Sequence, residues 1–233
     1  MTTSSKNFAW LVVIVLLCGG FLWWQQREPS ELTTVRIGTS VGISLALMDI
    51  ATSKDFFKEE GLNIEIKQFT GGKFALQALV GGSLDLATAA EFPITLATMQ
   101  GAKLSMLAQI DETKEFSMIL RKGNSSSNPT TYFTKKRKIG TSVGGSPEFF
   151  TSQFFKKYNI NPSQYEIVSI KPEDAPILLS QGSVDGIAIY EPYAHVAIQH
   201  TGKDNVWVLN EPNIYSQSMV LIATPDWSVK HEQ

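Results

Sequence analysis

From residue 35 onward, apolar positions follow two spacings that alternate along the chain. Short apolar or alternating runs predict strands, and longer stretches with apolar residues three or four apart predict helices. Glycines such as Gly61, Gly81 and Gly82 mark where helices are expected to stop. The expected strands are 35–37, 62–66, 85–89, 104–110, 138–139, 165–170, 186–190, 206–208 and 218–224, and the expected helices are 45–57, 74–80, 91–99, 147–158, 173–180 and 191–200.

Short motifs in the first half of this pattern recur in the second half. The pentapeptide Gly-Thr-Ser-Val-Gly occurs at 38–42 and at 140–144, Phe-Phe-Lys at 56–58 and 154–156, and Gly-Ser-x-Asp at 82–85 and 182–185. The offset of about 100 residues is longer than the roughly 20 to 50 residues of a solenoid unit. We therefore predict an α/β fold with two lobes of similar βαβ topology around a cleft.

The lobe boundaries follow from the strongest linker signal, Asn-Ser-Ser-Ser-Asn-Pro at 124–129. We predict a first lobe of residues 34–123 plus 216–233, a hinge crossing at 124–137, and a second lobe of residues 138–215 that ends in a return crossing. A chain that leaves one lobe, builds another and comes back has two hinge crossings.

The N-terminus carries a different pattern. Residues 8–24, which begin at Phe8 and end at Trp24, are uncharged and strongly apolar, with Lys6 before them. Their length is at the lower limit of about 17 to 25 residues for a membrane-spanning helix. We predict that residues 1–28 hold a membrane anchor with the N-terminus inside, so that the rest lies in the periplasm or at the cell surface. A cleaved signal peptide is the alternative, although no Ala-x-Ala site follows the segment.

Cys18 is the single cysteine. It excludes an intrachain disulfide and a cysteine-based metal site. Cys18 is either a lipid acceptor or a buried thiol in the apolar segment, and the large Leu17 before it disfavours lipidation.

Composition narrows the function classes. The chain has 233 residues, 43% hydrophobic content, a formal charge of −2 and a pI near 5.9. This balance gives no electrostatic case for nucleic acid. The one basic run, residues 135–138, is interpreted as a solvated edge where a strand begins.

The candidate binding residues lie where strands lead into helices. Ligands of open α/β sheets bind beyond the carboxyl ends of the strands, and a helix N-terminus offers unpaired N–H groups to an anion. The alternative is that the hydroxyls among these residues cap their helices. The polar candidates are Thr39, Ser40, Thr70, Gly71, Gly72, Thr141, Ser142 and Ser146.

Glu91 and Glu191 occupy matching places in the repeat, each at the end of a predicted strand. A carboxylate there either favours the following helix dipole or receives a cationic ligand group. Aromatic residues near the cleft either line it or belong to the cores; these are Phe69, Phe92, Phe149, Tyr190 and Tyr193.

No motif of an enzyme or a metal site is present. His195, His200 and His231 lack a His-Glu-x-x-His pattern and are interpreted as structural. Because no nucleophile can be paired with a base, we expect no catalysis, no metal and no cofactor.

Together these residues resemble the nitrate, sulfonate, taurine and thiamine-precursor group of ABC-transporter substrate-binding proteins. The resemblance rests on Phe-Lys-Glu-Glu-Gly-Leu-Asn-Ile-Glu-Ile at 57–66, Gly-Gly at 71–72, Ala-Leu at 78–79, both Gly-Ser-x-Asp motifs and Glu-Pro at 191–192, and it covers about residues 35–225.

The resemblance implies a type II periplasmic-binding fold that closes by hinge motion over a small solute and presents it to a permease with its ATPase. The family's ligand loops fall on Thr39, Ser40, Thr70, Gly71, Gly72, Ala90, Glu91, Thr141, Ser142 and Glu191. Members usually continue with helices that complete the first lobe, so this chain is expected to be a C-terminally short form with apolar surface exposed on that lobe.

We therefore expect the extracytoplasmic solute-binding component of an ABC importer, taking a small anionic or zwitterionic organic solute. Glu91 favours a ligand with a cationic group. The alternative is a membrane-tethered sensory or regulatory domain with the same fold. The thiamine-pyrimidine synthases resemble this family in fold, but their activity needs an active-site histidine and a cysteine-rich loop. Because the one cysteine here, Cys18, lies in the apolar segment, we do not expect that enzymatic activity.

Overall fold

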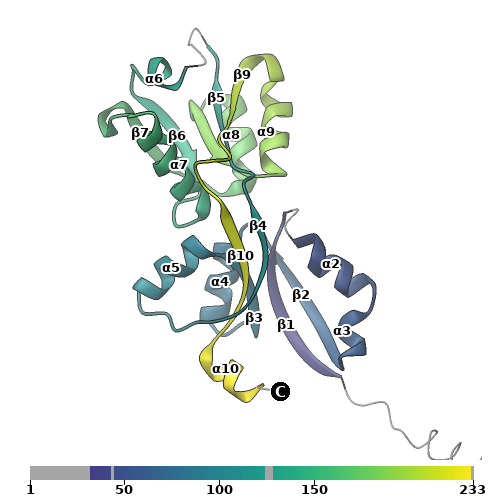
Figure 1. The fold of residues 1–233 in the computed structure, drawn as a ribbon. Coiled ribbons are helices and arrows are strands. Elements are labelled where there is room, and N and C mark those ends of the chain that lie inside the picture. The colour runs from purple at the N-terminus through teal and green to yellow at the C-terminus, as the bar shows by residue number, and fades with distance from the viewer. Residues whose placement is uncertain (1–31, 43–44, 124–127, 232–233) are drawn as a thin grey trace, which may run out of the picture.

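The computed structural model describes residues 32–42, 45–123 and 128–231. These residues form two lobes, each built on one five-stranded mixed sheet with helices on its faces (Figure 1). The predicted α/β fold with two lobes of similar topology is confirmed.

The first sheet has the strand order β2-β1-β3-β10-β4. β1 is parallel to β2 and β3, whereas β10 is antiparallel to β3 and β4. The elements of this lobe are β1 (Thr33–Ser40), α2 (Ala46–Ser53), α3 (Phe56–Glu59), β2 (Leu62–Phe69), α4 (Gly72–Val80), β3 (Leu86–Ala90), α5 (Glu91–Met99), β4 (Ser105–Thr113), β10 (Gln217–Ala223) and α10 (Pro225–Lys230).

The second sheet repeats this plan in the order β7-β6-β8-β5-β9. β6 is parallel to β7 and β8, and β5 is antiparallel to β8 and β9. The elements are β5 (Ser117–Arg121), α6 (Pro129–Tyr132), β6 (Arg137–Thr141), α7 (Ser146–Lys157), β7 (Tyr165–Ser169), α8 (Ala175–Gln181), β8 (Gly186–Ile189), α9 (Tyr193–Thr201) and β9 (Val206–Asn210), with 3-10 turns at Pro162–Gln164, Pro172–Asp174 and Lys203–Asn205.

The chain passes from one sheet to the other twice. After β4 the chain enters the second sheet as β5, and after β9 it returns to the first sheet as β10. Both entering strands take the fourth place in their sheet. The crossings are therefore residues 114–116 and 211–216, and they run side by side between the lobes in Figure 1.

The predicted crossing at 124–137 is wrong. β5 precedes that segment and already pairs with β8 and β9 of the second sheet. Met118, Ile119 and Leu120 are completely buried there, and such a short continuous apolar run is what a central strand produces. The described part of 124–137 contains α6, whose Tyr132 is buried in the core of the second lobe.

The repeated pentapeptide begins inside a strand and continues past the end of that strand. β1 continues through Ser40 and β6 through Thr141. A Cβ atom on Gly38 would lie 2.4 Å from Leu84 Cδ1, and one on Gly140 would lie 2.8 Å from Ile170 Cδ1. Close packing against the neighbouring core therefore explains why both repeats have glycine at this place.

The repeated Asp of Gly-Ser-x-Asp joins the same two strands. The Arg36 N–H donates to Asp85 Oδ2 at 2.8 Å, and the Lys138 N–H donates to Asp185 Oδ2 at 2.8 Å. In return, the Asp85 N–H donates to the Arg36 carbonyl and the Asp185 N–H to the Lys138 carbonyl. The same Asp therefore binds the backbone of β1 in the first lobe and of β6 in the second lobe.

Replacing Gly38 with alanine is expected to lower the free energy of unfolding by about 1–3 kcal/mol, because Leu84 must move within a packed core. Ala75 and Phe69 also lie 3.2 Å from the added carbon. Gly140→Ala is expected to have a similar effect. Urea unfolding measures both changes, and an unchanged midpoint in Gly38→Ala would refute the packing argument.

Helix boundaries differ from the prediction in several places. The helix expected at 45–57 is split into α2 and α3, with Asp55 between them at a φ of 57°. The helix expected at 191–200 begins two residues later, at Tyr193, and Glu191 and Pro192 form a turn before it. The helix at 91–99 has the predicted bounds.

The first lobe exposes several large apolar side chains. Leu47, Ile50 and Phe56 on α2 and α3 are exposed, as are Met99 on α5 and Met106 on β4. Neither α2 nor α3 has a buried residue. The apolar surface expected on this lobe is therefore present in the described part of the chain.

The predicted anchor at residues 8–24, including Cys18, lies outside the described residues. Among residues 32–42, 45–123 and 128–231, no helix has both the length and the apolar character needed to cross a membrane.

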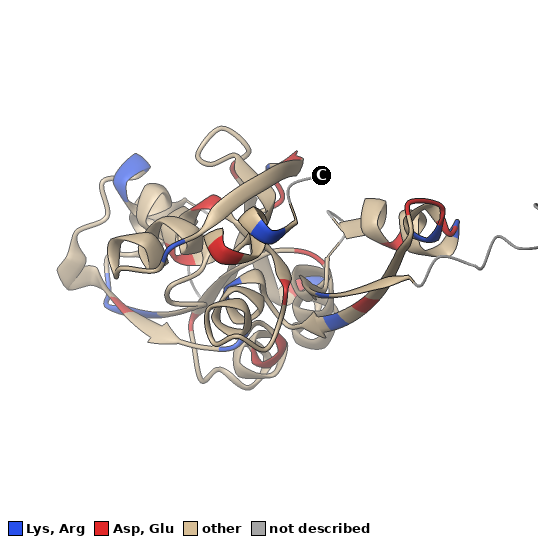
Figure 2. Cartoon of the chain, turned by 90° about the horizontal axis from the view of Figure 1, so that it is seen from below, with Lys and Arg blue, Asp and Glu red and all other residues tan. Residues whose placement is uncertain are grey.

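Charges of both signs are distributed over both lobes (Figure 2). Within the basic run at 135–138, Lys136 lies 3.7 Å from Glu166 and Arg137 lies 3.5 Å from Asp185. Acidic neighbours on the second lobe therefore accompany two of its four cations.

Candidate functional site

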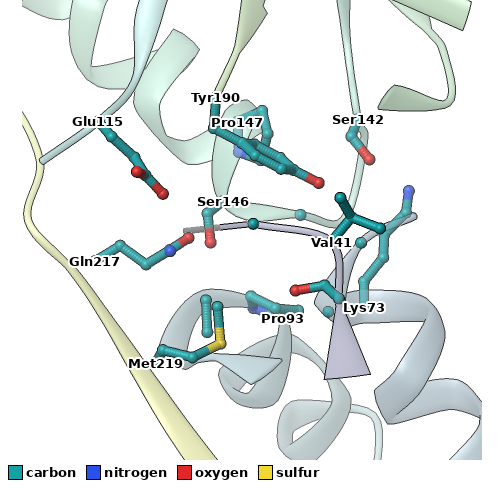
Figure 3. A pocket seen from close by; sticks show the side chains of 16 residues that line it. Val41, Lys73, Pro93, Glu115, Ser142, Ser146, Pro147, Tyr190, Gln217 and Met219 are labelled. Carbon is teal, nitrogen blue, oxygen red and sulfur yellow. The ribbon is translucent and has the colours of Figure 1, made fainter. Parts of the chain in front are cut away.

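A cavity of about 500 Å³, including the space at its open mouth, lies between the two lobes (Figure 3). Its walls come from the ends of β1 and β3, the starts of α4 and α7, the first crossing and β10. Both halves of the repeat therefore contribute to one site, at the carboxyl ends of parallel strands.

Three helices begin at this cavity, and none of the three has a side-chain cap. Their N-cap residues are Gly71 for α4, Ala90 for α5 and Gly145 for α7, and no side-chain hydrogen bond caps any of these helices. All three N-caps line the cavity. Because the first N–H groups of a helix have no partner within it, these ends offer donors and partial positive charge to an anion.

Lys73 adds a full positive charge to the same wall. It is the second residue of α4 and lines the cavity. A cation in the first turn is unfavourable for the helix dipole by about 0.3–1 kcal/mol, and an anion beside it would offset that cost. Burial lowers the pKa of the Lys73 ammonium, and Glu148 opposes the shift.

Hydroxyl groups complete the donor set. Ser40, Ser142 and Ser146 are buried, and all line the cavity. Figure 3 shows Ser142 and Ser146 projecting into the space. Ser146 Oγ lies beside Tyr215, yet among the described residues it makes no hydrogen bond of full geometry.

The structure brings together about half of the predicted binding residues. Ser40, Gly71, Gly72, Ala90, Ser142 and Ser146 line the cavity. Since none of the three helices is capped by a hydroxyl, the capping alternative does not describe these serines.

The three predicted threonines lie outside the lining. Thr39 and Thr141 are buried strand residues, and Thr141 Oγ1 has no hydrogen-bond partner within the described part of the chain. Thr70 contributes its carbonyl to the other lobe, accepting from the Tyr190 hydroxyl at 3.0 Å and from the Tyr193 hydroxyl at 3.4 Å.

Glu91 and Glu191 also lie outside the lining, and both carboxylates accept hydrogen bonds from other groups of the protein. Glu91 Oε1 accepts from the Tyr215 hydroxyl at 2.5 Å, and Oε2 accepts from the Ser218 N–H at 2.9 Å. Glu191 Oε2 accepts from the His195 N–H at 3.0 Å. Glu91 thus fastens the return crossing to α5, and this geometry gives no support to its expected role as the partner of a cationic ligand group.

The aromatic candidates have divided roles. Tyr190 lines the cavity, and Phe69 packs against the first core. Phe92 on α5 and Phe149 on α7 meet across the lobes with ring centroids 5.1 Å apart.

The sequence prediction missed several lining residues. Lys73 lies one position beyond the predicted Gly71-Gly72 pair, and its cation at a helix start was an available signal. Gln217 and Met219 come from β10, which enters from the far end of the chain. The other missed residues are Val41, Gly42, Pro93, Glu115, Gly145 and Pro147.

Glu115 is the carboxylate that lines the cavity. It lies in the first crossing, half-buried, on the side opposite Lys73 in Figure 3. Burial raises the pKa of the Glu115 carboxyl, and the Asp111 and Glu191 carboxylates raise it further, while a hydrogen bond with Thr113 opposes them. Burial also raises the pKa of Tyr190, which keeps this phenol neutral.

Direct contacts hold the lobes together around the cavity. Lys73 Nζ donates to the Val143 carbonyl at 2.6 Å, from α4 to the turn before α7. The Gly144 N–H of that turn donates to Glu148 Oε2 at 2.7 Å. The bonds of Lys73 to Val143 and of Tyr190 and Tyr193 to Thr70 therefore join the two lobes beside the cavity. Such a site can enclose a small oxyanion and exclude water from it.

Comparison with known proteins agrees with this geometry. Residues 44–233 match the family model described as NMT1/THI5 like. The taurine-binding periplasmic protein of Escherichia coli (strain K12) is 22% identical over 148 residues, which are 64% of this chain and 45% of that protein. The chain spans between 45% and 65% of the length of the curated relatives it matches.

Solved structures share the two-lobed fold. The periplasmic aliphatic sulphonate binding protein of Escherichia coli superposes with a TM-score of 0.69 at 22% identity, over 85% of this chain and 67% of that one. The periplasmic nitrate-binding protein of Synechocystis PCC 6803 superposes with a TM-score of 0.68 at 15% identity, over 87% of this chain and 58% of that one. The resemblance drawn from the motifs is confirmed, and the chain belongs to the NMT1/THI5-like family.

Proposed function

We propose that this protein is the extracytoplasmic solute-binding component of an ABC importer. It captures a small anionic or zwitterionic organic solute between its lobes, without changing it chemically, and delivers it to a permease. The observation that carries the proposal is the meeting of three uncapped helix N-termini and the Lys73 ammonium in one cavity formed by both lobes.

The chemistry of this wall suits a sulfonate, a nitrate or a carboxylate. N–H donors, serine hydroxyls and an ammonium all donate hydrogen bonds, and bonds to a charged acceptor are stronger than bonds between neutral groups. The relatives named as binding proteins for sulfonates, taurine or nitrate support the same ligand class.

Capture and release would use the two crossings as hinges. Residues 114–116 and 211–216 are the places where the chain passes between the sheets. The lobes contact each other through the hydrogen bonds of Lys73, Tyr190 and Tyr193 and through the rings of Phe92 and Phe149. Rotation about the two short segments can open the cavity when these contacts separate.

The N-terminal segment gives this receptor its place in the cell. We propose that residues 8–24 anchor the protein to the membrane, with the lobes in the periplasm or at the cell surface. Membrane fractionation, followed by protease treatment of intact and permeabilised cells, tests the attachment and the side on which the lobes lie.

A thermal-shift scan of the full-length chain tests the binding function. Taurine, ethanesulfonate, nitrate and glycine betaine, each at millimolar concentration, cover the ligand class and one zwitterion with a quaternary cation. A ligand at a hundred times its dissociation constant adds about 2.7 kcal/mol of stability, which raises the melting temperature by several degrees. A selective rise with an oxyanion is expected, and a cooperative melt that none of them shifts would argue for a tethered sensory role instead.

A further inference from the structure

Glu115 is the feature of the cavity that a receptor for a simple anion does not need. It lies in the crossing between β4 and β5, where neither sheet requires a carboxylate, and it lines the cavity. In Figure 3 its carboxylate points into the space from the side of Gln217, while Lys73 and Ser142 lie on the other side. The cavity is therefore polarised, with positive charge at one end and a carboxylate at the other.

No cation of the described residues pairs with this carboxylate. The ion pairs in the described ranges involve other acidic residues. The charged groups that act on Glu115 are Asp111 and Glu191, both carboxylates, and Thr113 supplies one hydrogen bond. Half-buried charge without a counter-ion is costly, and a cation brought by a ligand would relieve that cost.

The other two candidate carboxylates are already satisfied within the protein. Both oxygens of Glu91 accept hydrogen bonds, from Tyr215 and Ser218, and Glu191 accepts one from the backbone of His195. Neither of them lines the cavity. Of these three glutamates, Glu115 is the one that a ligand can reach.

We propose that Glu115 receives the ammonium group of a zwitterionic ligand whose acidic group lies at the three helix N-termini and Lys73. This inference rests on the proposed binding function and narrows its ligand class to short ω-amino sulfonates or ω-amino carboxylates. Glu115 is then a specificity residue, because a ligand without the ammonium leaves the half-buried carboxylate without a counter-ion.

Two matched pairs of ligands test the proposal by isothermal titration calorimetry of the full-length chain. Taurine and ethanesulfonate differ by one amino group, as do β-alanine and propionate. We expect at least one amino ligand to bind about tenfold more tightly than its partner, the usual effect of a hydrogen-bonded charge. Glu115→Gln is expected to abolish that preference, so that the two members of the pair bind with similar affinity.

The control is Glu112→Gln, in the strand just before the crossing. Glu112 is exposed, accepts from the Ser216 hydroxyl and does not line the cavity. This variant is expected to keep the wild-type preference. A preference that survives in Glu115→Gln, or that Glu112→Gln removes equally, would overturn the assignment to Glu115.

A pH series gives a second readout. The groups that face Glu115 are Asp111, Glu191 and the neutral Tyr190, and burial together with the two carboxylates raises its pKa. Taurine affinity is therefore expected to fall as the pH is lowered through a value above that of an ordinary glutamate, whereas ethanesulfonate affinity does not fall there. Equal binding of both members of each pair in the wild type would overturn this inference and leave the binding function standing. Binding of none of the four would overturn this inference, and titration with nitrate would then decide whether the binding function stands.

Discussion

Replacing Lys73 with methionine is expected to weaken the binding of ethanesulfonate by about tenfold to a hundredfold, the usual worth of a hydrogen bond to a charged group. Methionine retains the length and most of the volume of the side chain. The substitution removes the one Lys or Arg among the described lining residues, together with the bond from Nζ to the Val143 carbonyl. Both losses act in the same direction, because in the proposed site the ammonium contacts the anion and its bond to Val143 joins the lobes around it.

Lys103→Met is the matched control for this loss of charge. Lys103 lies in the same lobe, is exposed and is absent from the cavity lining. Calorimetry should give wild-type affinity for this variant. If Lys73→Met also bound ethanesulfonate as tightly as the wild type, the anion would not lie at the start of α4.

The second large effect is expected on stability. Glu91→Ala should lower the free energy of unfolding by about 2–4 kcal/mol, because the Tyr215 hydroxyl and the Ser218 N–H both lose a charged acceptor. Tyr215 is buried, and burial together with Glu91 raises the pKa of its phenol, so the hydroxyl keeps its proton and needs an acceptor. For a chain of this size the loss corresponds to a melting temperature lower by several degrees.

The repeat supplies the control for this prediction. Glu191 occupies the same place in the second lobe but accepts one backbone N–H, at the start of α9. Glu191→Ala should therefore cost about 1 kcal/mol or less. Thermal unfolding of both variants measures the difference, and equal melting temperatures would show that Glu91 does not fasten the return crossing.

Internal repetition made much of the fold predictable. The matching Gly-Ser-x-Asp motifs indicated that the two lobes have the same local structure at this place. In the structure, Asp85 and Asp185 make equivalent hydrogen bonds with the backbone of β1 and β6. The predicted bounds of α5 are correct because a buried strand, Leu86–Ala90, ends directly at its first residue.

Exchange of strands between the halves was not predictable from local patterns. The run of residues 117–121 is apolar enough for a central strand, but its sheet is decided by pairing with β8 and β9, which are distant in the chain. A polar stretch at 124–129 is a stronger local linker signal than the short crossing at 114–116, so the boundary was placed too late.

The cavity residues likewise divide into those that a local pattern marks and those that only distant parts of the chain bring to the site. Gly71 and Ala90 were predicted because each lies where a strand leads into a helix. Glu115 and Gln217 reach the cavity through the crossings and β10, and no sequence motif marks them. The contacts of Glu91 were not predictable from local patterns because its two partners, Tyr215 and Ser218, are more than a hundred residues away.

Calorimetric titration of the full-length chain with taurine, ethanesulfonate and nitrate, in parallel with Lys73→Met, tests the central claim most directly. The account predicts saturable binding of one ligand per chain for at least one of these compounds, with a clearly lower affinity in the variant. A folded protein that binds none of them, or that binds them equally well without the Lys73 ammonium, would contradict an anion site between the lobes.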